Sequence, residues 1–226
     1  MKIPSGYKIP VLVYHSVSEI PFNIPIYSIE PDIMQSHIEI LLNSGYNFIT
    51  FDDLPNIERI KKPILLTYDD GYEDNFNYLF PILKKYNVKA TISIIFNNVG
   101  VSRYLNQQQI KTMLESKLVS FQSHTLSHVD LNTIDESQIE FELSESKSQI
   151  SKLIKKEPIA IFYPYGNFSA NVIKIAEKYY EYGVTANSDC WTTGNNDYAI
   201  GRLFVGRGLP AQELLNKLSY WINQGN

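Results

Sequence analysis

Residues 64–72 read ILLTYDDGY, and this stretch decides how the rest of the chain is interpreted. Its apolar first half has the length and composition of a buried β-strand. Asp69 and Asp70 follow at the expected strand end, directly before Gly71. Because adjacent residues at a strand end point in different directions, one carboxylate can hold a cation while the other moves a proton. Taken alone, the same residues also fit an ordinary Asp-Gly turn.

Outward from this stretch, strand-like and helix-like segments alternate along the chain. The expected strands are residues 10–15, 46–51, 64–68, 90–96, 118–121, 159–163, 182–186 and 202–205. The expected helices are residues 31–43, 75–86, 106–116, 135–155, 169–180 and 210–223. Such alternation predicts parallel strands joined by right-handed crossovers.

The count and spacing of these segments predict a single α/β domain over residues 1–226, built as an irregular (β/α)7-8 barrel. An open, doubly wound sheet is the alternative. No G-x-G-x-x-G stretch follows the first strand, which counts against a dinucleotide-binding fold.

Polar residues at the expected strand ends also favour the barrel. His15, Asp69, Asp70, His124 and Tyr165 all fall at or just beyond the carboxyl ends of different strands. In a barrel these ends share one face, where active sites are built. Residues that are far apart in the sequence are therefore expected to converge.

The spacing of two histidines indicates a metal site. His124 and His128 lie four residues apart, so both rings can face one ion, although this spacing alone is weak evidence. Asp70 would complete a set of two nitrogens and one oxygen that leaves positions open for water and substrate. Asp69 could then accept a proton as a base, and the backbone N–H of Tyr165 could stabilise an oxyanion. On its own, the Pro-Tyr-Gly sequence around Tyr165 fits a simple turn.

Four segments carry a resemblance to a known family: TYDDG at 67–71, SHTLSH at 123–128, FYPYG at 162–166 and PVLVYHSV at 10–17. The first three resemble the motifs of polysaccharide deacetylases with the NodB homology domain, carbohydrate esterase family 4. The last resembles the opening of the branch that includes poly-N-acetylglucosamine deacetylases. The resemblance extends over nearly the whole chain.

The resemblance implies a metal-dependent N-deacetylase on a distorted (β/α) barrel, acting on an N-acetylated sugar or polysaccharide. It implies Asp69 as the base and Asp70, His124 and His128 as ligands of a divalent metal, usually Zn2+. Co2+, Ni2+ and Fe2+ are alternatives, because two histidines and a carboxylate accept several divalent ions.

The chain departs from the family pattern in its third motif and near its end. Phe162 stands where the family often has an arginine that orients the base, and we predict that Arg202 replaces it as the partner of Asp69. No histidine follows His128, so the family's late leucine-histidine motif is absent. We therefore predict His15 as the general acid that protonates the leaving amine.

Substrate contacts are predicted at two aromatic residues. Tyr165 lies in the third motif, and Trp191 follows an aspartate in a loose echo of the family's fourth motif. Two other functions stay open at this point. One is a C–N hydrolase that opens a small cyclic amide on the same barrel, and the other is a catalytically inactive barrel that only binds glycan.

Composition excludes several classes of protein. The 226 residues carry a formal charge of −4 with no basic cluster, so nucleic-acid binding is not expected. No apolar run is long enough to span a membrane. A single cysteine, Cys190, rules out an internal disulfide and fits a reducing compartment. Without a signal-like N-terminus, the chain is expected to be cytoplasmic, or extracytoplasmic if it was trimmed. The sequence does not predict the oligomeric state.

Overall fold

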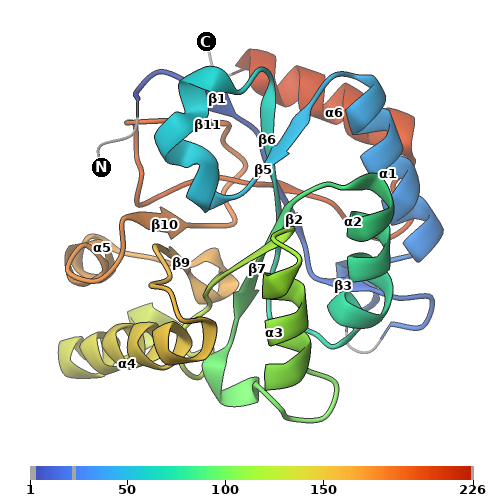
Figure 1. The fold of residues 1–226 in the computed structure, drawn as a ribbon. Coiled ribbons are helices and arrows are strands. Elements are labelled where there is room, and N and C mark those ends of the chain that lie inside the picture. Colours follow the sequence, from blue (N-terminus) through green and yellow to red (C-terminus); the bar gives the residue numbers. More distant parts are fainter. Residues whose placement is uncertain (1–3, 22–23, 225–226) are drawn as a thin grey trace.

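The computed structural model describes residues 4–21 and 24–224. Parallel strands curl into an irregular barrel with helices packed around its outside (Figure 1), which confirms the expected fold class. The strands are β1 (Lys8–Ile9), β2 (Val11–Tyr14), β3 (Ser16–Val17), β4 (Ser28–Ile29), β5 (Asn47–Ile49), β6 (Pro63–Tyr68), β7 (Ala90–Ile94), β8 (Val119–Ser123), β9 (Ala160–Phe162), β10 (Tyr182–Val184), β11 (Trp191–Thr192) and β12 (Leu203–Phe204). The α-helices are α1 (Pro31–Asn43), α2 (Phe80–Tyr86), α3 (Gln107–Glu115), α4 (Glu136–Ile154), α5 (Ala170–Ala176) and α6 (Ala211–Gln224).

The main sheet runs in the order β10-β9-β8-β7-β6-β2-β12, with β5 also paired to β6. The last strand lies beside the first long one, because β12 pairs in parallel with β2. On the side of β12 away from β2, the residues that lead into β12 form hydrogen bonds with the segment after β10. The Thr185 N–H donates to Ile200 O at 2.9 Å, and the Arg202 N–H donates to Asn187 O at 2.7 Å. These irregular contacts link the two sides of the curled sheet, so Arg202 reaches the same interior as β2 and β6.

Two expected elements change type along their length, whereas others differ only at their ends: the helix expected at 169–180 is α5 (Ala170–Ala176), and the strand expected at 90–96 is β7 (Ala90–Ile94). The strand expected at 46–51 ends at Ile49, because Thr50 and Asp53 form a capping box that starts the 3-10 helix η2 (Phe51–Arg59). The helix expected at 75–86 begins as one π-turn, η3 (Asn75–Leu79), before α2. Pro81 lies in the first turn of α2, where a missing backbone N–H costs nothing, so the regular helix can begin there.

Alternation along β6 divides the packing between two layers. Leu66 and Tyr68 join the large core under the outer helices, whereas Leu65 belongs to the smaller core inside the barrel. Because side chains alternate along a strand, Thr67 and Asp69 face inward like Leu65. The barrel interior is therefore apolar at the amino end of β6 and polar at its carboxyl end.

Candidate active site

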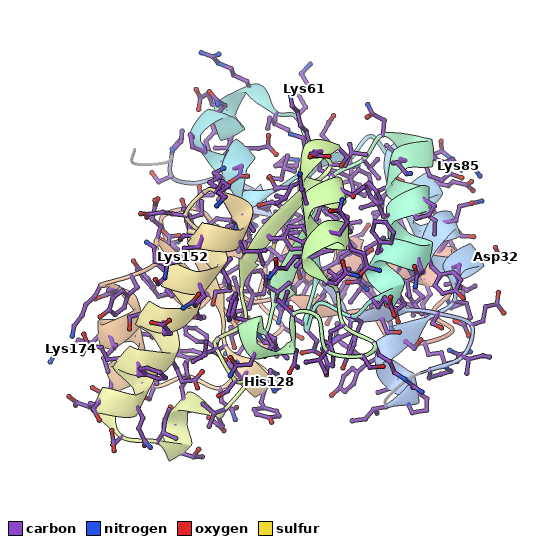
Figure 2. The ribbon with its side chains drawn as sticks, turned by 60° about the horizontal axis from the view of Figure 1, so that its bottom comes forward. Asp32, Lys61, Lys85, His128, Lys152 and Lys174 are labelled. Carbon is purple, nitrogen blue, oxygen red and sulfur yellow. The ribbon has the colours of Figure 1, made fainter. Side chains whose placement is uncertain are left out.

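Three residues with metal-binding side chains meet at the carboxyl ends of β6 and β8. Asp70 Oδ1 lies 3.4 Å from His124 Nε2 and 3.6 Å from His128 Nε2. One ligand atom from each of these residues can be chosen so that all three lie within 4.8 Å of one another. Figure 2 shows His128 at the lower face of the molecule, opposite Lys61, which precedes β6. The structure therefore brings together the three residues predicted as ligands.

Local contacts constrain His124 and the residue that follows Asp70. The backbone N–H of His124 donates to Ile94 O at 2.9 Å. Its ring Nδ1 lies 2.8 Å from Phe162 O, so this nitrogen carries a proton; Nε2 donates to Asp70 when the ring is protonated and offers its lone pair to a metal when the ring is neutral. Gly71 has φ of 73°, and a Cβ there would lie 2.8 Å from the Ile94 side chain. Glycine is therefore required directly after Asp70.

The charges in the cluster fit a bound cation. Burial would lower the pKa of His124, but the hydrogen bond to Asp70 and the two nearby carboxylates raise it above its usual value. Burial and the neighbouring His124 lower the pKa of His128 to about 4. Burial would raise the pKa of Asp70, but its contact with His124 lowers it. Two imidazoles and one ionised carboxylate form a donor set that suits a divalent metal, whose binding requires deprotonated ligands.

The second aspartate is held by an arginine inside the barrel. Arg202 Nη1 donates to Asp69 Oδ1 at 2.8 Å and Nη2 donates to Oδ2 at 2.7 Å. Both residues are buried, with 2% and 3% of their surface exposed. Burial would raise the pKa of Asp69, but Arg202 and His124 more than offset this and hold the pKa well below its usual range. The contact predicted between Arg202 and Asp69 is therefore present.

Phe162 shows how this pairing is built without an arginine in the third motif. The Arg202 guanidinium carbon lies 5.2 Å from the centre of the Phe162 ring. The Arg202 Nε also donates to Thr185 O at 2.9 Å. The guanidinium thus enters from the residue directly before β12 and rests on the aromatic side chain that occupies the motif position.

Ser93 is a contact of Asp69 that the sequence analysis missed. Its hydroxyl donates to Asp69 Oδ1 at 2.9 Å. Asp69 Oδ1 therefore accepts two hydrogen bonds in the structure, and Oδ2 accepts one. Strand alternation along β7 would have indicated Ser93, since Thr91 and Ser93 are polar residues two apart in a buried strand.

His15 lies just beyond β2, close to both carboxylates. Burial lowers its pKa, while the charges of Asp69 and Asp70 act in the opposite direction. Its Nδ1 is enclosed and has no hydrogen-bond partner among the described residues. The ring stacks on Tyr27, with centroids 4.6 Å apart, and the Asn75 amide donates to the His15 carbonyl at 2.9 Å. The structure therefore brings His15 to the edge of the cluster.

Tyr165 is at the site and Trp191 is not. Tyr165 has φ of 60° and is 65% exposed, and its ring contacts His128 at 4.8 Å. Trp191 is 3% exposed, packs against Phe51 and pairs with Ile9 at the amino end of the barrel. Its indole N–H donates to Asp197 at 3.1 Å. This position, opposite the metal-binding face, does not support the predicted substrate contact of Trp191.

Comparison with known proteins identifies the family. Residues 56–183 match the polysaccharide deacetylase family, and the chain belongs to it. The Bacillus subtilis (strain 168) protein YxkH is 32% identical over 216 residues, which cover 92% of this chain and 75% of YxkH. Poly-beta-1,6-N-acetyl-D-glucosamine N-deacetylase of Staphylococcus aureus (strain MSSA476) is 27% identical over 197 residues, covering 79% of this chain and 68% of the relative.

A solved deacetylase structure has the same fold as this chain. Streptococcus pyogenes deacetylase PplD, in complex with acetate, superposes with a TM-score of 0.88 at 30% identity, covering 95% of this chain and 99% of PplD. In the described part of this chain, no helix combines the length and apolar character needed to cross a membrane.

Proposed function

We propose that this protein is a metal-dependent hydrolase that removes N-acetyl groups from an N-acetylated sugar or polysaccharide. The family membership supports deacetylation, and the relative from Staphylococcus aureus supports a poly-N-acetylglucosamine substrate. The observation that carries the proposal is the convergence of Asp70, His124 and His128 beside the buried carboxylate of Asp69.

In the proposed mechanism, three side chains bind the metal. Asp70, His124 and His128 would hold a divalent metal, with Zn2+ preferred and Co2+, Ni2+ or Fe2+ as alternatives. Such an ion would polarise the amide carbonyl and lower the pKa of a water molecule. The residues around the metal site carry out the remaining steps.

Asp69 acts as the general base in this mechanism. As the water oxygen attacks the acetyl carbonyl carbon, the water proton passes to the Asp69 carboxylate. Oδ2 is the better acceptor of the two oxygens, because Oδ1 already accepts hydrogen bonds from both Ser93 and Arg202. Arg202 keeps the carboxylate ionised and holds it in one orientation.

Two further groups act on the reacting amide. The backbone N–H of Tyr165 donates none of the hydrogen bonds found between described residues, so it is free to stabilise the oxyanion. His15 then protonates the amine as the C–N bond breaks, which releases acetate and a free amino sugar. Its place beside Asp69 and Asp70 supports this role.

Release of acetate from N-acetylglucosamine oligomers, measured together with the new free amines, tests the proposed function. The wild-type protein should release acetate and amine in equal amounts, and Asp69→Asn should be nearly inactive. A panel of cyclic amides serves as the comparison substrate. Hydrolysis of these amides with no acetate from any N-acetylated sugar would contradict the proposal.

A further inference from the structure

A buried carboxylate on α4 has no part in this reaction, yet it contacts the loop between the two metal-binding histidines. Glu142 is 8% exposed. Its Oε2 accepts hydrogen bonds from the backbone N–H groups of Leu126 and Ser127, both at 3.0 Å, and its Oε1 accepts the Ser127 hydroxyl. Because a buried carboxylate is costly unless its oxygens are satisfied, these three donors hold Glu142 and the loop together.

The loop held by Glu142 has unfavourable backbone angles at both ends. Thr125 has φ of 66° and His128 has φ of 62°, in the left-handed region. A non-glycine residue in this region is strained and persists only where its surroundings fix it. The two residues between them, Leu126 and Ser127, are those whose N–H groups bind Glu142. Without these bonds, the loop could relax towards more favourable angles.

The two histidines of the cluster depend on this loop to different degrees. The ring of His124 is anchored by its hydrogen bond to Phe162 O. For His128, the hydrogen bonds found within the described residues include no comparable anchor. Its ring approaches Asp70 and makes ring contacts at 4.7 Å with His124 and 4.8 Å with Tyr165. The direction of the His128 side chain is therefore set mainly by its backbone.

We propose that Glu142 is a positioning residue for the metal centre: it fixes residues 125–128 in the conformation that presents His128 to the ion, and so sets the metal affinity. The inference rests on the metal site of the proposed function. Loss of a group that orients a metal ligand typically weakens metal binding about 10–100-fold.

The test compares Zn2+ affinity with the stability of the metal-free protein in three variants. Glu142→Leu keeps the bulk of the side chain and removes all three acceptor contacts. Glu142→Gln can keep the pattern, because its amide oxygen can accept both N–H groups and its amide nitrogen can donate to the Ser127 hydroxyl. Glu140→Gln is the control for charge, since Glu140 lies on the same helix and pairs with Lys178 at the surface. The Zn2+ Kd is measured by competition with a chromophoric chelator, and the Tm is measured without metal.

The Kd of Glu142→Leu should rise about 10–100-fold, while both glutamine variants stay close to wild type. An unchanged Kd in Glu142→Leu, even with a lower Tm, would show a merely structural role and overturn the proposal. An equal loss in Glu142→Gln would also overturn it, because charge rather than hydrogen bonding would then be responsible. If Glu142→Leu does not fold, Ser127→Ala replaces it and should show a smaller rise in Kd, and no rise would refute the inference. Absence of Zn2+ binding by the wild type would instead refute the proposed metal site, and the inference with it.

Discussion

Replacing Arg202 with methionine should leave Asp69 as an unpaired carboxylate inside the barrel. Methionine fills a similar space but offers no hydrogen-bond donor. The change removes both charge-assisted hydrogen bonds to Asp69, at 2.8 and 2.7 Å, and the bond to Thr185 O. Lysine would be a poor replacement, because a point charge cannot reproduce the two parallel contacts of a guanidinium.

The expected loss in the free energy of unfolding of Arg202→Met can be estimated in two ways. Breaking a buried ion pair by removing one partner destabilises a protein by about 3–5 kcal/mol. An adjacent cation lowers the pKa of an aspartate by roughly 1–3 units, and at about 1.4 kcal/mol per unit this corresponds to roughly 1.4–4 kcal/mol. The two estimates overlap at about 3–4 kcal/mol. For a chain of this length, each kcal/mol lowers the Tm by about 2–4 °C, so we expect a fall of roughly 6–16 °C.

The stability lost in Arg202→Met should decrease as the pH falls. In the wild type, the pKa of Asp69 lies below its unfolded value of about 3.9. Its stabilising contribution is therefore complete above that pH and is lost as the pH falls towards the folded pKa. In Arg202→Met, burial dominates and raises the pKa above the unfolded value, so ionisation destabilises the variant as the pH rises. The difference between the two proteins should be largest near pH 7, should narrow below the unfolded pKa of about 3.9, and should vanish only as the pH approaches the much lower folded pKa of wild-type Asp69.

Urea unfolding of the metal-free proteins at several pH values measures this difference. Arg59→Met is the control, because Arg59 is an exposed residue whose pair with Glu58 should be worth only about 0–1 kcal/mol. In the metal-loaded enzyme, the acid limb of the kcat/KM profile should move upward by about 1–3 pH units in Arg202→Met. A stability loss independent of pH, together with an unchanged acid limb, would refute the claim that Arg202 controls the ionisation of Asp69.

Three further predictions concern the site residues. Asp69→Asn should keep its metal while turnover falls about 10²–10⁴-fold, and a metal-free preparation would show that Asp69 is a ligand instead. Asp70→Ala should lose metal and activity together, as measured by elemental analysis and acetate release, and an active metal-free variant would contradict this. His15→Ala should lose turnover on an N-acetyl amide but keep most of it on an activated acetyl ester, whose leaving group needs no proton. Equal losses on both substrates would exclude His15 as the acid.

The residues at the ends of regular strands were the easiest to predict from the sequence. Asp69 and Asp70 follow the apolar run that becomes β6, and His124 follows the shorter Leu-Val-Ser-Phe segment that leads into β8; parallel strands bring such ends to one face. Arg202 could be predicted as the partner of Asp69 because the last strand of a barrel neighbours the first, as β12 and β2 do here.

Irregular segments could not be predicted in the same way. Trp191 lies between β10 and β12, where the chain has no periodicity that would show to which end of the barrel it returns. There it pairs with β1 at the amino end, so the motif-like Asp-Cys-Trp sequence was misleading. The anchoring role of Glu142 was also hidden, because a glutamate on an amphipathic helix resembles solvated surface until its three donors are seen.

We propose that this protein cleaves N-acetyl groups by means of an ion held by Asp70, His124 and His128. The most direct measurement follows bound metal and acetate release from N-acetylglucosamine oligomers in one preparation, before chelation, after chelation and after Zn2+ is restored. We predict that activity disappears with the metal and returns in proportion to the Zn2+ bound. Full acetate release by the chelated, metal-free protein would contradict the account.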